Sequence, residues 1–283
     1  MKMLNPELIK SINEFVYKQP RAVQEIAELL SCSWITADKY TAHISEKYGT
    51  IKTKKFRGGT RGALKIVYWA NLEGIKTNTA QQIILEKIKK TTKKYDFNPF
   101  DIYNLVNKEK KNVEVIKKCG EQSISEIIKK TKTQLLIFSG NISFINKEED
   151  NKKVIDIIRE LAEKGINIKI LCRIDIASIR NIKKIIEINK SLGRDLIEIK
   201  HIEQPLRGFV IDYSLVRLRD EKLKVDYKEG EIDYDHYLLY NIHDQEWVEW
   251  IEKVFFNLHS NSLPLETRLH DLEEIEELLV NMN

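Results

Sequence analysis

Apolar residues recur every three or four positions in three stretches near the start of the chain, at residues 5–20, 23–30 and 35–48. This is the spacing of amphipathic helices that pack on one another. Residues 50–69 then change to strand-like alternation around two adjacent glycines, which favours a β-hairpin. The first 72 residues are therefore expected to form a domain of three helices followed by a hairpin.

Two lysine-rich helical patterns follow, at residues 76–95 and 101–111, separated by Asn98-Pro99. The residue before a proline is disfavoured in a helix, so the first pattern should end there. Each pattern has an apolar side that needs a partner. We interpret residues 73–112 as a helical connector, which serves either as a simple linker or as a contact between two protomers.

From residue 113 onward, short apolar runs alternate with helical periods. Apolar residues between Val115 and Ile128 predict a helix. Expected strands lie at residues 134–139, 166–172, 196–201, 208–212 and 215–218, and expected helices at residues 152–164 and 176–192. This alternation predicts a sheet covered by helices. We therefore predict an α+β multidomain fold in which residues 113–283 form an α/β domain.

The second and third helices carry a helix-turn-helix pattern over residues 26–44. Ala27 is small enough for the two helices to cross closely, and Ser33 can cap the third helix. In a helix-turn-helix, the start of the third helix enters the major groove of DNA. Candidate DNA contacts on this helix are Ser33, Thr36, Lys39 and His43. Trp34 fits either a hydrophobic plug at the turn or a base contact, and a domain that binds protein instead of nucleic acid is the alternative.

The hairpin carries six basic residues and no acidic residue between Lys52 and Lys65, with Gly58-Gly59 at its centre. Glycine tolerates the positive φ angles of a tight turn, and the cations can lie along phosphates. Expected phosphate contacts are Lys52, Lys54, Lys55, Arg57 and Arg61, with Lys65 on the return strand. Together with the three helices, this wing resembles the winged helix-turn-helix domain of archaeal and bacterial transcription regulators.

The charge of the chain is unevenly distributed. Residues 1–120 contain 23 basic and 12 acidic residues, a net of +11, whereas the remainder contains 24 and 31, a net of −7. Such a split predicts that the N-terminal part meets a polyanion and the C-terminal part does not. Double-stranded DNA is therefore the expected partner, and solvated lysine-rich helices are the alternative reason for the asymmetry.

Cysteine usage and hydropathy indicate the compartment. Cys32, Cys119 and Cys172 have no C-x-x-C spacing and fit reduced thiols. No apolar run approaches the roughly 20 residues that span a bilayer, and no basic-then-apolar leader opens the chain. We expect a cytoplasmic protein without membrane contact.

Neither a metal nor a cofactor is expected. The acidic and histidine residues between Asp233 and His243 match no standard metal spacing. The sequence contains no phosphate-binding loop, no dinucleotide-binding motif and no nucleophile elbow.

Three segments of the C-terminal part resemble the phospholipase-D-like domain of archaeal regulators of the TrmB family. They are SISEIIKKTKTQLLIFSGNISFI at 123–145, ELAEKGINIKILCR at 160–173 and PLRGFVIDYSLVRLRD at 205–220. The tail, in which Trp247 and Trp250 precede Leu263-Pro264, resembles the ending of the same family. The resemblance implies a phospholipase-D-like domain at residues 113–283 that senses an effector, often a sugar in this family, or makes dimer contacts.

Active phospholipase-D-like enzymes carry a His-x-Lys-x4-Asp motif, in which the His attacks a phosphodiester and the Lys holds the phosphate. With the Asp of this motif aligned on Asp212, Arg207 occupies the Lys position and Pro205 the His position. Proline has no nucleophilic atom, so we expect no catalytic residues, and we assign Arg207 and Asp212 to an effector site. An enzyme that uses His201 instead is the alternative.

The sequence thus predicts a DNA-binding transcriptional regulator. We expect a homodimer, because operators are usually read as two half-sites, and a small-molecule effector is a candidate partner. The alternatives are a phosphodiesterase or nuclease, and a chromatin protein that coats DNA without strong sequence preference.

Overall fold

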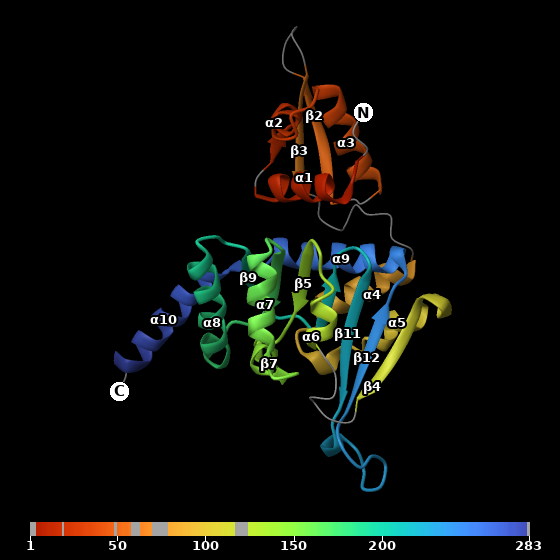
Figure 1. Ribbon diagram of the computed structural model, residues 1–283, viewed down its shortest axis with the longest axis vertical. Helices are drawn as coiled ribbons and strands as arrows, with labels where there is room; N and C mark the ends of the chain where they lie inside the picture. Colours follow the sequence, from red (N-terminus) through yellow and green to blue (C-terminus); the bar gives the residue numbers. More distant parts are fainter. Residues whose placement is uncertain are drawn as a thin grey trace. The chain divides into compact units, whose positions relative to one another are not determined.

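The computed structural model describes residues 4–18, 20–47, 50–57, 63–69, 79–116 and 124–281. The chain divides into two compact units, residues 1–78 and 79–283 (Figure 1). The tip of the predicted wing with Arg61, the side chain of Arg57, the predicted helix end at Tyr48 and the first part of the predicted connector lie outside the described residues.

In the first unit, three helices and a three-stranded antiparallel sheet share one core. The elements are α1 (Pro6–Lys18), β1 (Arg21–Ala22), α2 (Val23–Leu29), α3 (Trp34–Lys47), β2 (Ile51–Arg57) and β3 (Ala63–Trp69). Strand β3 lies between β1 and β2. The apolar stripes supply the core, since Ile12, Ile26 and Ile44 are each 0% exposed. Three helices followed by a hairpin confirm the predicted winged helix-turn-helix.

The second unit is built on one eight-stranded mixed sheet. Its strands are β4 (Lys111–Ile116), β5 (Gln134–Phe138), β8 (Asn167–Cys172), β9 (Ile197–His201), β10 (Gly208–Ile211), β11 (Leu215–Lys222), β12 (His236–Ile242) and β13 (Leu263–Pro264). Their order is β13-β9-β8-β5-β10-β11-β12-β4. Strand β8 is parallel to β5 and β9, and the other pairs are antiparallel.

Helices cover both faces of this sheet. They are α4 (Thr79–Lys90), α5 (Phe100–Leu105), α6 (Ile124–Ile128), α7 (Val154–Glu163), α8 (Ile176–Leu192), α9 (Gln245–Ser260) and α10 (Leu265–Asn281). Helices α7 and α8 lie on one face and α9 on the opposite face (Figure 1). Helix α8 has the predicted bounds, and Gly193 ends it in a left-handed conformation at φ 60°. Among the described helices, none combines the length and apolarity that crossing a bilayer requires.

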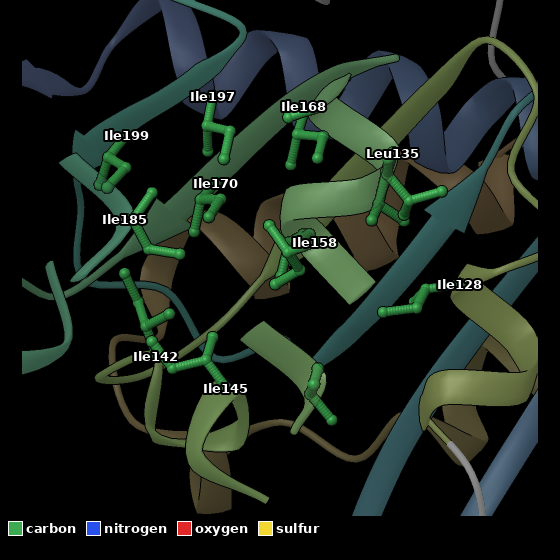
Figure 2. Packing of buried hydrophobic residues seen from close by; sticks show 14 of the residues in the cluster. Ile128, Leu135, Ile142, Ile145, Ile158, Ile168, Ile170, Ile185, Ile197 and Ile199 are labelled. Carbon is green, nitrogen blue, oxygen red and sulfur yellow. The ribbon is translucent and has the colours of Figure 1, made fainter. Parts of the chain in front are cut away.

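The core under α7 and α8 is made mostly of isoleucine. Figure 2 shows Ile185 of α8 beside Ile170 of β8, with Ile168 farther along the same strand, and all three are 0% exposed. Alternate residues of the inner strands face α9, where the rings of Phe138 and Phe255 have centroids 5.1 Å apart. Strands that are buried on both faces have continuous apolar sequences, which explains why the central strands were predicted to within a residue or two.

The helix predicted between Val115 and Ile128 is wrong in its first part. Residues 111–116 form β4, an edge strand of the sheet, and helix α6 begins only at Ile124. The sequence KNVEVI alternates polar and apolar residues, as a half-exposed strand does. Strand β12 has the same mixed character and is an addition to the predicted strands.

The helices of the predicted connector pack within the second unit. Ile84 and Ile88 of α4 are 5% and 1% exposed. Helix α5 places the ring of Tyr103 with its centroid 4.9 Å from that of Tyr240 in β12. Residues 79–112 therefore belong to the second compact unit, and a role in joining protomers stays a prediction.

Candidate functional site

The start of α3 is fixed by the turn that precedes it. Ser31 is left-handed at φ 49°, and the Cys32 N–H donates to the Ala27 carbonyl oxygen at 2.9 Å. The Ser33 hydroxyl accepts from the Thr36 N–H at 3.2 Å and lies 2.9 Å from the Thr36 hydroxyl. Ser33 therefore caps α3, as predicted. Ser33 and Thr36 both help to shape the turn.

One face of α3 is exposed and the other is buried. Lys39 and His43 lie one turn apart on the exposed face, and Ile35, one turn earlier, is 63% exposed. Ala37 on the opposite side is 0% exposed. Trp34 is 42% exposed, more than a plug in the core would be. The buried side anchors the helix, so the exposed side is available to enter a groove.

The hairpin distributes its cations over two faces. Side chains alternate along a strand, and Ile51 at the start of β2 faces the core with 0% exposure. Lys55 lies on this same face near the end of the strand, whereas Lys52 and Lys54 lie on the opposite one. We use the term basic surface for five residues of the first unit that lie on α3 and on both faces of β2: Lys39, His43, Lys52, Lys54 and Lys55.

Lys65 is not part of the basic surface, which corrects the expectation from the sequence. Its Nζ forms an ion pair with the Asp38 carboxylate of α3, and its side chain is only 10% exposed. Lys65 lies opposite Lys55 in the hairpin. The ion pair instead connects the return strand of the wing to the helix that carries Lys39.

The structure does not bring together Arg207 and Asp212, which the sequence assigned to one effector site. Strand β10 separates them, because Arg207 precedes its first residue and Asp212 follows its last. In the neighbouring strand β5, the end at Phe138 lies beside the Arg207 end of β10. The start at Gln134 lies beside the Asp212 end. The two residues therefore lie at opposite ends of strand β10.

Asp212 has a structural role at the start of β5. Its carboxylate accepts from the N–H groups of Lys132, Thr133 and Gln134 at 3.0, 2.8 and 3.0 Å. It also accepts from the Thr133 hydroxyl at 2.8 Å. These bonds use the carboxylate to hold the chain that enters β5, so Asp212 is not an effector contact.

Replacing Asp212 with alanine is expected to destabilise the second unit by about 3 kcal/mol, because several N–H groups lose a charged acceptor. Alanine is also disfavoured at the φ of 49° found there. Asp212→Asn keeps one acceptor oxygen and tolerates this conformation, so its cost should be about 1 kcal/mol. Urea unfolding of both variants, with the exposed Asp195→Ala as control, measures the difference. Equal losses in the two variants would contradict this role.

A cavity of about 400 Å³ lies beside Arg207. The loop after β5 contributes Ser139 and Gly140 to its lining, and β10, β11 and β12 contribute further residues. Phe209 and Leu239 supply apolar surface. The cavity is therefore amphipathic, with Arg207 at the end of the sheet opposite Asp212.

The other arginines of the cavity have carboxylate partners. Arg217 Nη2 donates to the Glu114 carboxylate at 2.9 and 3.0 Å. Arg219 and Lys94 both form ion pairs with Glu221. These pairs neutralise much of the positive charge contributed by β11 and by the segment after α4.

Arg207 is held differently. Its Nη1 donates to the main-chain oxygens of Gln204 and Leu206 at 2.9 and 2.6 Å. No carboxylate in the described part of the chain forms an ion pair with it. Burial lowers the pKa of the Arg207 guanidinium, and the nearby Arg173 acts in the same direction. Arginine nevertheless stays charged, so the cavity contains a cation that pairs with none of the described carboxylates.

The candidate nucleophile His201 lies away from this cavity. It ends β9, and two strands, β8 and β5, separate β9 from β10. Its Nδ1 accepts from the Ile174 N–H at 2.8 Å. Burial lowers the pKa of His201, and the Arg268 guanidinium adds to this effect. Within the described residues, no three His, Cys, Asp or Glu side chains are grouped so that they could hold a metal ion.

No family model and no curated protein matches this sequence. Among solved structures, the archaeal chromatin protein TrmBL2, reported to show a novel mode of DNA binding, is 16% identical over 93% of this chain and 95% of its own, with a TM-score of 0.41. Nuc from Salmonella typhimurium, a phospholipase D family member, is 12% identical over 54% of this chain and 97% of its own, with a TM-score of 0.36. NucT from Helicobacter pylori is 14% identical over 55% of this chain and 99% of its own, with a TM-score of 0.39.

Proposed function

We propose that this protein is a DNA-binding transcriptional regulator. Its first unit reads duplex DNA, and its second unit binds an effector or pairs two protomers without catalysing a reaction. The basic surface carries the proposal, because an exposed face of α3 with Lys39 and His43 lies on the same small unit as a lysine-rich wing. The helix suits the major groove and the wing suits phosphates. We expect a homodimer that reads two half-sites.

Fluorescence anisotropy with duplex DNA at several salt concentrations tests this proposal. Affinity should fall steeply with salt, with a slope set by the number of phosphate contacts. An affinity for duplex DNA that is absent or insensitive to salt would refute it. Footprinting across a genome then separates two kinds of binder, because discrete protected sites indicate a regulator and continuous protection indicates a chromatin protein.

The absence of catalysis is also part of the proposal. Its support is Pro205 at the nucleophile position of the motif and the placement of His201 two strands away from the cavity. Incubation of the purified protein with bis(p-nitrophenyl) phosphate and with DNA should give no turnover. Hydrolysis that the His201→Ala variant abolishes would identify a phosphodiesterase instead.

The double variant Asp38→Asn/Lys65→Gln is expected to bind DNA with an unchanged salt dependence, because the ion pair has no net charge to present to phosphates. Lys55→Gln should reduce the slope of log K against log salt by about 0.9, since it removes one phosphate contact. Anisotropy titrations at four salt concentrations measure both slopes. If the double variant lowers the slope as much as Lys55→Gln does, Lys65 contacts phosphate directly.

A further inference from the structure

We propose that the cavity beside Arg207 binds a small organic oxyanion, a molecule with a carboxylate or phosphate group on an apolar body. This ligand class rests on the proposed role of the second unit as an effector-binding domain and makes that role specific. The arguments are the unused edge of one guanidinium, the charge balance of the cavity and the nature of its walls.

One edge of the Arg207 guanidinium has no hydrogen-bond acceptor among the described residues. Nη1 is occupied by two main-chain oxygens, and within the described residues nothing accepts from Nε or Nη2. Gly140 faces this second edge, because a Cβ built on it would lie 3.1 Å from Nη2 and 3.2 Å from Nε. A residue larger than glycine would therefore press on the donors. Two parallel N–H groups on one edge suit the two oxygens of a carboxylate or phosphate.

The charge balance of the cavity favours an anion. Glu114 neutralises the charge of Arg217. Arg219 and Lys94 share the single negative charge of Glu221, so together they keep one unit of positive charge. Arg207 and Lys147, which also lines the cavity, add to this excess, since no described carboxylate forms an ion pair with either. A neutral ligand would leave these charges uncompensated.

Apolar residues that line the cavity favour a ligand with an apolar body. The rings of Phe209 and Phe144 pack edge to face with centroids 5.6 Å apart, and both line the cavity with Leu239. Its volume of about 400 Å³ lies in the range of small-molecule pockets. Apolar walls and a half-buried cation together fit a ligand with one charged end better than a free inorganic ion.

Isothermal titration of the full chain, without DNA, tests the inference with phenyl phosphate, benzoate, inorganic phosphate and phenol. Phenyl phosphate or benzoate should bind at least about tenfold more tightly than phenol, because only the oxyanions can receive charge-assisted hydrogen bonds. A preference for phenyl phosphate identifies phosphate esters as the ligand class, and a preference for benzoate identifies carboxylates. Equal binding of phenol, or no binding of either aromatic anion at about 10 mM, would overturn the proposal.

Variants locate the binding. Arg207→Gln removes the charge and the two guanidinium nitrogens beyond Nε, and should weaken anion binding about tenfold or more. Gly140→Ala keeps the charge, crowds the donor edge and should weaken binding as well. Arg180→Gln, an exposed arginine on α8, is the control and should bind as the wild type does. Unchanged binding by Arg207→Gln would exclude the site. Parallel anisotropy with DNA separates the two proposals, since DNA binding can persist when no anion binds.

Discussion

Replacing the four lysines of the basic surface with glutamine is expected to lower the affinity for duplex DNA by about 100-fold or more near 0.1 M salt. Each phosphate contact contributes about 0.9 to the slope of log K against log salt, so the slope should fall by about 3 to 4. Lys39 lies on the exposed face of α3 and the other three lie on β2. The loss should therefore be seen with every DNA sequence, because phosphates are common to all of them.

A control variant with the same change in net charge shows whether DNA affinity depends on the position of the lysines or on the total charge of the chain. Lys153, Lys164, Lys190 and Lys228 are exposed residues of the second unit, and replacing them with glutamine changes the net charge of the chain equally. Titrations at four salt concentrations should give this control nearly the wild-type affinity and slope. If both quadruple variants lose affinity to the same extent, binding follows overall charge and the basic surface has no special role.

The central strands and the helix α8 of the second unit could be predicted from the sequence, and the edge strand β4 could not. Strands β5 and β8 are buried on both faces, so their apolar runs stand out. Helix α8 has strong periodicity and a glycine that ends it at φ 60°. Strand β4 is half exposed at an edge. Its pairing with β12, which is distant in the sequence, is decided by tertiary contacts that local patterns do not encode.

Some features of the candidate sites could likewise be predicted from the sequence, and others depend on the fold. Ser33 as a cap and Lys39 as an exposed residue follow from helical spacing, because the period fixes the side of the helix. The pairing of Lys65 with Asp38 depends on how the hairpin approaches α3, so charge alone misplaced Lys65. The alignment of a sequence motif assigned Arg207 and Asp212 to one site, but the four-residue strand β10 lies between them and holds them at its opposite ends. Gly140 lies in the segment 123–145, whose sequence gives no sign that the glycine faces a guanidinium; only the fold shows this contact.

The free energy of unfolding of the wild type is expected to fall as the pH rises, and the Glu252→Gln variant is expected not to show this fall. Glu252 lies on α9 with 8% exposure, and its Oε1 accepts from Gln134 Nε2 at 2.6 Å. Burial raises its pKa from the ordinary 4.5 to about 8, and the charge of Glu249 acts in the same direction. The folded state therefore holds this proton more tightly than the unfolded state. The resulting stabilisation is complete below the unfolded pKa and is lost as the pH rises through the folded pKa.

The magnitude follows from the size of that shift. Between pH 6 and pH 9 the wild type should lose about 3 kcal/mol relative to Glu252→Gln, since one pH unit corresponds to about 1.4 kcal/mol per proton. Glutamine keeps the carbonyl that accepts from Gln134 and has no charge to bury. Urea unfolding followed by the fluorescence of Trp247 and Trp250, after the other two tryptophans are changed to phenylalanine, reports on α9. Glu163→Gln, at an exposed position, should follow the wild type. A constant difference in stability between wild type and Glu252→Gln across this range would show that Glu252 is ionised in the folded protein.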